Sequence, residues 1–391
     1  MKYNLLQILF WMSSCSVIGF ITIFLQYKGL SNTQIGIVTG VASISSIALS
    51  PYLSSLIEKI KGLTIKKLFT IVYGYMFIAF LVLILFNLPA LLVMILYTTL
   101  YCLSISIVPL LSSICTNYLK EGKYINFGVS RGMGSVSYAI SAVILGQLVN
   151  YLNPTILGCV FIIVGILLIS LLLSMPDFMA SNNTNEKKES VSIITIIKNY
   201  RTFFLVLLAF SFTFGAASSL AVYLINIVTS LGGDTSLYGI AVFAMAASEM
   251  PFMSITHTLL KKFKSETLLL AAILFYICRN FTICLAPNLP ILIIGMMFQG
   301  CSYGIFTATI TMYVNDYLKP EHQMMGQSMI AMMSTGLGSF MGNVVGGILQ
   351  DTIGLTGMYV YACSLTTIGV IIGVLTLRKK VGLRKSETSL A

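Results

Sequence analysis

Two ionisable residues interrupt long apolar stretches of this sequence. Glu249 lies within the apolar run 237–260, and Arg279 lies within the run 266–286. A charged side chain at the centre of a membrane helix costs about 2.5–3.5 kcal/mol even on insertion scales, so such a residue indicates a functional site or an ion pair. At 1.5 Å per residue, the two would lie about 16 and 20 Å above the inner ends of their helices, both near the midplane.

Glu249 can take up and release a proton, while a nearby arginine stays charged throughout. We therefore predict that Glu249 and Arg279 form a proton-coupling pair. A static ion pair that holds the two helices together remains the alternative.

The elements that must position this pair follow from the composition. The 391 residues are 57% hydrophobic and only 9% charged, with a mean hydropathy of +0.94. A water-soluble domain carries about 25% charged residues, so soluble, disordered and fibrous classes are excluded. A bilayer core needs about 20 apolar residues per helix. Twelve such runs predict twelve membrane helices: 6–27, 34–56, 67–87, 90–117, 132–152, 155–175, 201–229, 237–260, 266–286, 289–313, 325–349 and 356–377.

Because the runs are continuously apolar, not alternating, they predict helices and not a β-barrel. Nearly all of the 23 Lys and Arg residues fall at the termini or in the even-numbered turns, with Lys28 an exception on the opposite side. The positive-inside rule then places both termini in the cytoplasm of a cell-membrane protein. The net charge of +11 is thus a topology signal, and no nucleic-acid partner is expected.

A polar stretch at 181–192 divides the chain after six predicted helices. Pro-Tyr-Leu-Ser at 51–54 is echoed by Pro-Phe-Met-Ser at 251–254, and Gly-Met-Gly-Ser at 132–135 by Gly-Leu-Gly-Ser at 336–339. The two members of each pair are separated by nearly the same number of residues along the chain. This favours two parallel six-helix repeats that rock about a central site. The expected organisation is a first bundle at 1–178, a cytoplasmic linker at 179–200, a second bundle at 201–378 and a tail at 379–391.

The turn after the second predicted helix resembles the signature of the major facilitator superfamily, Gly-x-x-x-Asp-Arg/Lys-x-Gly-Arg-Arg/Lys. The matching positions are Ser54, Glu58, Lys59, Gly62, Lys66 and Lys67. Serine replaces the glycine and glutamate the aspartate. The resemblance covers essentially the whole chain and implies an all-α fold of twelve membrane helices in two bundles. It also implies that Ser54, Glu58, Lys59 and Gly62 form a cytoplasmic latch.

Residues 127–135, Phe-Gly-Val-Ser-Arg-Gly-Met-Gly-Ser, are similar to a motif of lactose permease and related proton symporters. This resemblance implies that Arg131 binds solute and that Tyr138 stacks on a sugar ring. Those sugar carriers have a glutamate where this chain has Ser113, so a galactoside is less expected than another sugar-like, nucleoside-like or anionic solute. Arg131 could instead be an inner-face topology charge.

Proton coupling in that branch also uses ionisable residues of the tenth helix. The run 289–313 has none, so Glu249 would carry most of the coupling here. Uncharged polar residues complete the candidate solute site, although packing between helices is an equal explanation for each. They are Asn117, Tyr101, Gln299 and Asn343.

The remaining chemistry-bearing residues form no recognisable site. The eight cysteines have no CxxC or Cys/His spacing and read as small buried hydrophobes. Trp11, the single tryptophan, is expected to anchor a helix at the membrane interface. No catalytic, metal-ligating or phosphate-binding pattern is present, so neither an enzyme nor a cofactor is expected.

The sequence therefore predicts a secondary active transporter that imports a small polar solute with protons. Its expected partners are the solute, protons and the lipid bilayer, and it is expected to be a monomer. Proton-coupled efflux of drugs or metabolites is the first alternative, although the fifth predicted helix lacks the proline of the Gly-Pro motif typical of antiporters. A non-transporting membrane sensor is the second.

Overall fold

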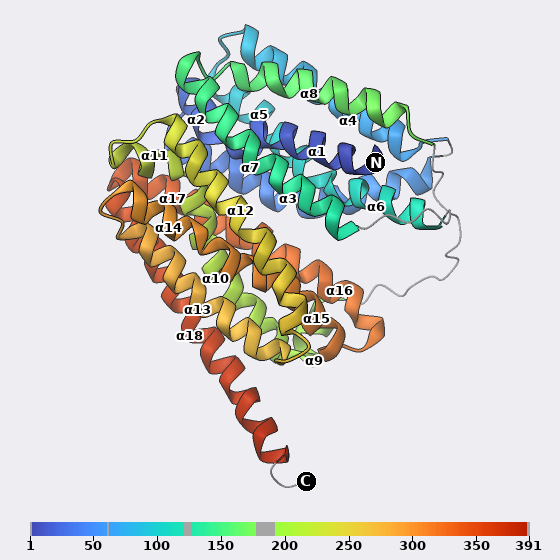
Figure 1. The fold of residues 1–391 in the computed structure, drawn as a ribbon, viewed down its shortest axis with the longest axis vertical. Coiled ribbons are helices and arrows are strands. Elements are labelled where there is room, and N and C mark those ends of the chain that lie inside the picture. Colours follow the sequence, from blue (N-terminus) through green and yellow to red (C-terminus); the bar gives the residue numbers. More distant parts are fainter. Residues whose placement is uncertain (1, 61, 121–126, 177–191, 389–391) are drawn as a thin grey trace. The chain divides into compact units, whose positions relative to one another are not determined.

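A computed structural model describes residues 2–60, 62–120, 127–176 and 192–388, and every regular element in those ranges is helical (Figure 1). The helices divide into two compact units. Within each unit, continuous apolar sequence forms helices because a helix satisfies its own backbone hydrogen bonds in lipid.

The first unit contains eight helices and a π-helical turn, together with the segment Gly233–Phe243. The first span is bent by 48° where α1 and the π-helix η1 meet α2. Ser31 and Gln34 form a capping box that starts α3. The elements are α1 (Lys2–Ser14), η1 (Cys15–Gly19), α2 (Ile21–Tyr27), α3 (Asn32–Lys59), α4 (Ile65–Leu85), α5 (Ala90–Ser106), α6 (Val108–Lys120), α7 (Phe127–Tyr151) and α8 (Ile156–Leu173).

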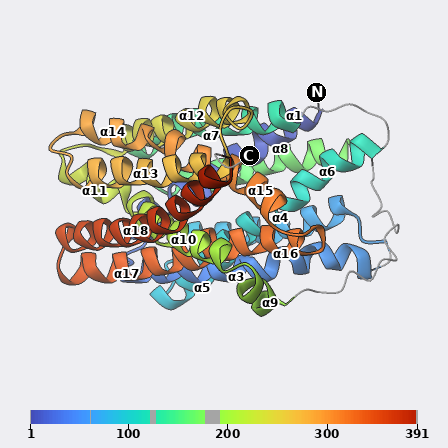
Figure 2. The same ribbon diagram turned by 90° about the horizontal axis from the view of Figure 1, so that it is seen from below.

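Helix α12 (Thr235–Leu259) begins in the first unit and continues in the second. In the second unit, α10 (Arg201–Val222) and α13 (Ser265–Cys284) pack along α18 (Leu355–Thr388), the longest helix (Figure 2). The other elements of this unit are α9 (Ile193–Asn199), α11 (Leu224–Ser230), α14 (Leu289–Met297), η2 (Gly300–Gly304), α15 (Ile305–Tyr317), α16 (Pro320–Ala331), η3 (Met332–Gly338) and α17 (Ser339–Thr352).

Among the described residues, ten helices are long and apolar enough to cross a membrane, and the bent pair in the first span raises the number to eleven. These confirm the predicted all-helical membrane fold. The eleventh predicted run, 325–349, falls on α16, η3 and α17, which are not among the ten or eleven. A total of twelve spans therefore stays a prediction.

The end of the predicted cytoplasmic linker, residues 179–200, is helical. Ser192 caps α9, and the side chain of Ile196 in this helix is fully buried. Helix α9 packs on α10 and α16. Most of the polar stretch that defined the linker lies outside the described residues.

Small residues let helices α10 and α17 approach closely in the second unit. A Cβ atom on Gly342 would lie 1.9 Å from the carbonyl oxygen of Gly215. Glycine is required at this point because any side chain would strike the backbone of the neighbouring helix. The core of the first unit relies instead on stacked aromatic rings, including the parallel pair Tyr73 and Phe161.

Candidate functional site

Glu249 faces its own helical unit and is hydrogen-bonded there. The side-chain nitrogen of Gln299, which directly precedes η2, donates to Glu249 Oε1 on α12 over 3.0 Å. The other amide atom, Gln299 Oε1, is buried and accepts no hydrogen bond from any described residue. The structure thus brings together two residues that the sequence analysis treated separately, one as a proton site and the other as a solute ligand.

The π-helix η2 holds this pair in place. It starts directly after Gln299, and its first backbone N–H, at Gly300, donates to Ser248 Oγ over 3.1 Å. A Cβ atom on Gly300 would lie 2.3 Å from the carbonyl oxygen of Ser248, so only glycine permits this approach. Single π-helical turns within longer helices occur frequently at functional sites.

Arg279 lies on α13 and is 1% exposed. It donates to Asn280 Oδ1 over 2.9 Å, and its interaction with Glu249 is electrostatic. Asn280 in turn donates to Thr366 Oγ1 on α18 over 2.8 Å. Arg279 Nε is buried without a hydrogen-bond partner among the described residues. The arginine is therefore held by neighbours on α13 and α18 and acts on Glu249 as a fixed charge.

Phenol groups on two elements also face this region of the second unit. Tyr276, one turn before Arg279, interacts electrostatically with both Arg279 and Glu249, and Tyr303 in η2 interacts with Tyr276. The ring of Tyr276 is fully buried. The site is therefore a polar group in which Arg279 and Tyr276 are buried, whereas Glu249, Gln299 and Tyr303 are half-buried.

Arg131 in the first unit is stacked on Trp11. Its guanidinium carbon lies 4.1 Å from the centre of the indole ring, and its Nη1 atom donates to Ser135 Oγ over 2.9 Å. Trp11 Nε1 donates to Gln7 Oε1 over 3.0 Å. Gly134 leaves room for the indole, because a Cβ atom there would lie 2.3 Å from Trp11 Cδ1.

Trp11 therefore belongs to a polar cluster inside the first unit, and its expected place as an anchor at the membrane interface stays a prediction. The sequence analysis missed Trp11 and Gln7 as site residues. Their spacing of four on α1 was a usable signal, since residues i and i+4 share one helix face.

Tyr138 lies beside the same indole. The two ring centres are 6.3 Å apart in an edge-to-face arrangement. Arg131 and Tyr138, which the resemblance paired, therefore meet at Trp11. Their role in solute binding stays a prediction.

The other candidate solute ligands are more deeply packed. Asn343 is fully buried between α10 and α17, where its side-chain oxygen accepts from Ser218 over 3.0 Å and its backbone oxygen from Tyr223 over 2.9 Å. Tyr101 is buried in α5. The side chain of Asn117 lies outside the described residues. The structure thus places Asn343 in a helix-packing network, and a solute would reach it only after the helices separate.

The predicted latch residues lie at the end of α3 and in the turn after it. Ser54 donates to the carbonyl oxygen of Ser50 within its own helix over 3.3 Å. Lys59 is exposed in the last turn, and Gly62 adopts a left-handed conformation with φ of 82°. Lys67 donates to the Gly62 carbonyl over 2.8 Å. The side chain of Glu58 lies outside the described residues, so the latch stays a prediction.

Lys66, another position that matches the motif, contacts a different helix. Its ammonium group donates to the carbonyl oxygens of Leu173 and Met175, at the end of α8. Cations are favourable at helix C-termini, where the last carbonyls lack intrahelical partners. This lysine therefore ties the turn before α4 to the end of α8 within the first unit.

Within the described ranges, no cluster of three or more His, Cys, Asp or Glu side chains could hold a metal ion. A buried guanidinium such as that of Arg279, within an apolar membrane span, is typical of solute and ion pathways. The comparisons agree: the chain matches the MFS_1 like family over residues 1–361. It belongs to this family and is a non-enzymatic transporter of the major facilitator type.

Two curated relatives are transporters. The uncharacterized transporter YwbF of Bacillus subtilis (strain 168) is 25% identical over 356 residues, which cover 88% of this chain and 85% of that protein. Maltose permease of Geobacillus stearothermophilus is 24% identical over 275 residues, covering 70% and 69%.

Solved structures share the fold. The nucleoside transporter NupG has a TM-score of 0.78 at 16% identity and covers 96% of each chain. A bacterial homologue of the human lysosomal transporter Spinster, in an inward-facing and unoccupied conformation, has a TM-score of 0.70 at 14% identity and covers 96% of each chain. At these identities the likeness extends to the fold alone.

Proposed function

We propose that this transporter imports a small polar solute together with protons by alternating access across the cell membrane. The observation that carries the proposal is the contact of Glu249 with Gln299 inside the second unit. A carboxyl group held there by a neutral amide, within electrostatic reach of Arg279, can exist in two protonation states. A carboxylate paired tightly with an arginine would stay ionised.

Gln299 suits both states of the carboxyl group. In the ionised state its amide N–H donates to Glu249 Oε1, as the structure has it. A protonated carboxyl carries an O–H that needs an acceptor. Gln299 Oε1 is buried and accepts no hydrogen bond from the part of the chain that the structure describes. Rotation of the amide by a half turn would exchange donor for acceptor without moving either helix.

The driving force is sufficient for accumulation. One elementary charge that crosses 100 mV carries about 2.3 kcal/mol. At about 1.4 kcal/mol per factor of ten, this supports a solute gradient of roughly 50-fold.

The cluster around Trp11 supports a ring-shaped polar solute. Trp11 and Tyr138 offer aromatic surfaces, and Arg131 offers hydrogen-bond donors beside them. Aromatic faces with a few polar groups suit sugar and nucleobase rings. Maltose permease and the nucleoside transporter NupG are named for solutes of the same two classes. We therefore propose a nucleoside or an oligosaccharide as the solute, with organic anions as the class that a screen must exclude.

The first experiment identifies the solute. Purified protein is screened by thermal shift against nucleosides, sugars and organic acids. A ligand from either of the first two classes supports the proposal, and stabilisation by organic acids alone contradicts the solute class.

The second experiment tests the coupling in proteoliposomes loaded with that solute. Glu249→Gln should abolish accumulation driven by a pH gradient, while counterflow of the solute continues, because exchange needs no net proton movement. Glu321→Gln, at an exposed carboxyl of α16, is the matched control and should accumulate solute normally.

Unchanged accumulation by Glu249→Gln would remove this residue from the mechanism. The direction of the pH-driven flux separates import from efflux. Binding without counterflow would favour the sensor alternative.

A further inference from the structure

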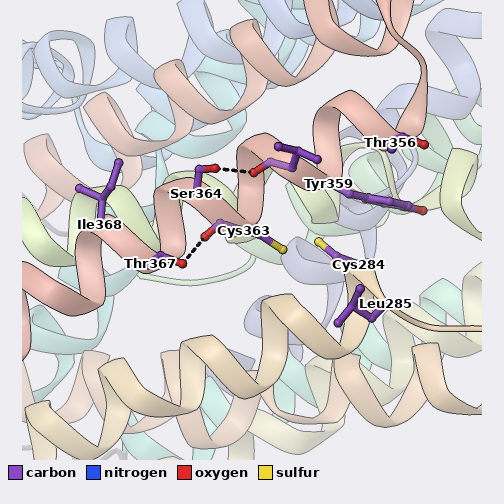
Figure 3. Close-up of a pocket in the computed structure, with 9 residues that line it drawn as sticks. Cys284, Leu285, Thr356, Tyr359, Cys363, Ser364, Thr367 and Ile368 are labelled. Atoms are coloured by element: carbon purple, nitrogen blue, oxygen red, sulfur yellow. Dashed lines mark hydrogen bonds between the residues drawn. The ribbon is translucent and has the colours of Figure 1, made fainter.

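Two cysteines that lie far apart in the sequence meet in the second unit. Cys284 is the last residue of α13, and Cys363 lies on α18. Both side chains line the same pocket, and their sulfur atoms point toward each other in the space between the two helices (Figure 3). Both thiols are free in the structure.

The register of the two helices is fixed next to this pair. Asn280, one turn before Cys284, donates to Thr366 on α18 over 2.8 Å. Thr366 lies one turn beyond Cys363 along α18. The hydrogen bond between Asn280 and Thr366 fixes the register of this antiparallel helix pair, and the two thiols lie one turn further along it. A covalent bond between them therefore requires no sliding of either helix.

A pocket of about 590 Å³ opens beside the thiols. It is lined by one face of α18, including Tyr359, Ser364 and Cys363, and by Cys284 and Leu285 from the end of α13 (Figure 3). Leu285 is 74% exposed. Because α13 ends here, a small reagent can enter the pocket from the helix ends.

We propose that Cys284 and Cys363 form a redox-active thiol pair that closes to a disulfide between α13 and α18. The oxidant is a low-molecular-weight disulfide that enters the pocket. The proposal does not depend on the nature of the transported solute or on proton coupling.

Accessibility sets the order of the two exchange steps. Cys363 is the more exposed of the pair, whereas Cys284 is 9% exposed. The thiolate of Cys363 attacks one sulfur of the small disulfide, whose S–S bond breaks and releases one thiolate, which takes up a proton. Cys284 then loses its proton and attacks the Cys363 sulfur, and the second small thiol leaves. Two protein thiols are oxidised to one disulfide, and the small disulfide is reduced to two thiols.

The test uses the full-length reduced protein in detergent, with oxidised glutathione as the probe. After incubation, free thiols are blocked with a maleimide of known mass and peptides are mapped by mass spectrometry. We expect a peptide cross-linked between Cys284 and Cys363, with two of the eight cysteines protected from the maleimide. The melting temperature should rise and should return on reduction, since a disulfide that closes a long loop restricts the unfolded chain.

Single variants separate the two steps. Cys284→Ser should hold glutathione as a stable mixed disulfide on Cys363, whereas Cys363→Ser should gain no adduct on Cys284 and no thermal shift. Cys278→Ser is the matched control, because Cys278 lies on the same helix and neighbours Cys301; it should cross-link as the wild type does.

An oxidised wild type with all eight thiols still reactive, or with a different pair joined, would overturn the proposal. So would a thermal shift of the same size in Cys363→Ser.

Discussion

At the residue scale, the hydrogen bond from Gln299 to Glu249 stabilises the charged form of that carboxyl group. A hydrogen bond to a charged group contributes about 1.5–3 kcal/mol, and one pH unit corresponds to 1.36 kcal/mol. Gln299→Leu removes the donor and so favours the protonated form. We expect the pH at which proton-driven uptake is half-maximal to rise by about one unit.

The measurement is the pH profile of uptake in proteoliposomes. Gln327→Leu is the control, because Gln327 donates to the Thr311 carbonyl on α15 and makes no contact with Glu249. A profile that stays unchanged in Gln299→Leu would show that the amide only packs α12 against η2.

The stacking of Arg131 on Trp11 gives a second residue-scale prediction. Trp11 is the single tryptophan of the chain, so intrinsic emission reports on this contact directly. Arg131→Ala should shift the emission maximum and weaken solute binding by roughly 5- to 30-fold, since cation–π and polar contacts there contribute about 1–2 kcal/mol. The melting temperature should change little.

Arg201→Ala, at an exposed position that starts α10, is the matched control and should leave emission and affinity as they are. Equal losses of stability and affinity in Arg131→Ala would instead favour a structural role for the arginine.

At the element scale, the approach of α10 and α17 depends on glycine. A Cβ atom on Gly342 would meet the Gly215 carbonyl oxygen at 1.9 Å, and backbone cannot yield as a side chain can. We expect Gly342→Ala to lower the free energy of unfolding by about 3 kcal/mol, the upper end of the range for overpacking. Thermal or denaturant unfolding in detergent measures this loss.

Gly74→Ala in α4 is the matched control, because no atom lies within 4 Å of the added methyl group. It should be neutral or slightly stabilising, since alanine favours a helix over glycine. Equal stability of the two variants would contradict the argument that this contact requires glycine.

At the scale of the whole molecule, the prediction concerns orientation. The excess of Lys and Arg at the termini and in the even-numbered turns predicts that both termini lie in the cytoplasm. A fluorescent protein fused to the carboxyl terminus should therefore mature and fluoresce. Alkaline phosphatase should be active when inserted in the turn after Lys28 and inactive at the carboxyl terminus. The reverse pattern of activities would show that the termini lie on the opposite side of the membrane and would contradict the prediction.

The helices could be predicted from the sequence because the length of an apolar run is a local property, which the thickness of the bilayer converts into a span. The predicted run 34–56 became α3, and the run 356–377 became the first part of α18. The bend of the first span at η1 and the π-helical turns η2 and η3 could not be predicted this way. They depend on how each helix packs against its neighbours.

The sequence by itself determined the membrane class and marked Glu249 and Arg279, because a charge within an apolar run carries a cost that needs no structure to recognise. Only the tertiary structure decided which side chains those residues meet. Glu249 contacts Gln299 from 50 residues away, Arg131 stacks on Trp11, and Cys284 meets Cys363. Such partners follow from the packing of separate helices, and no periodicity within one helix encodes them.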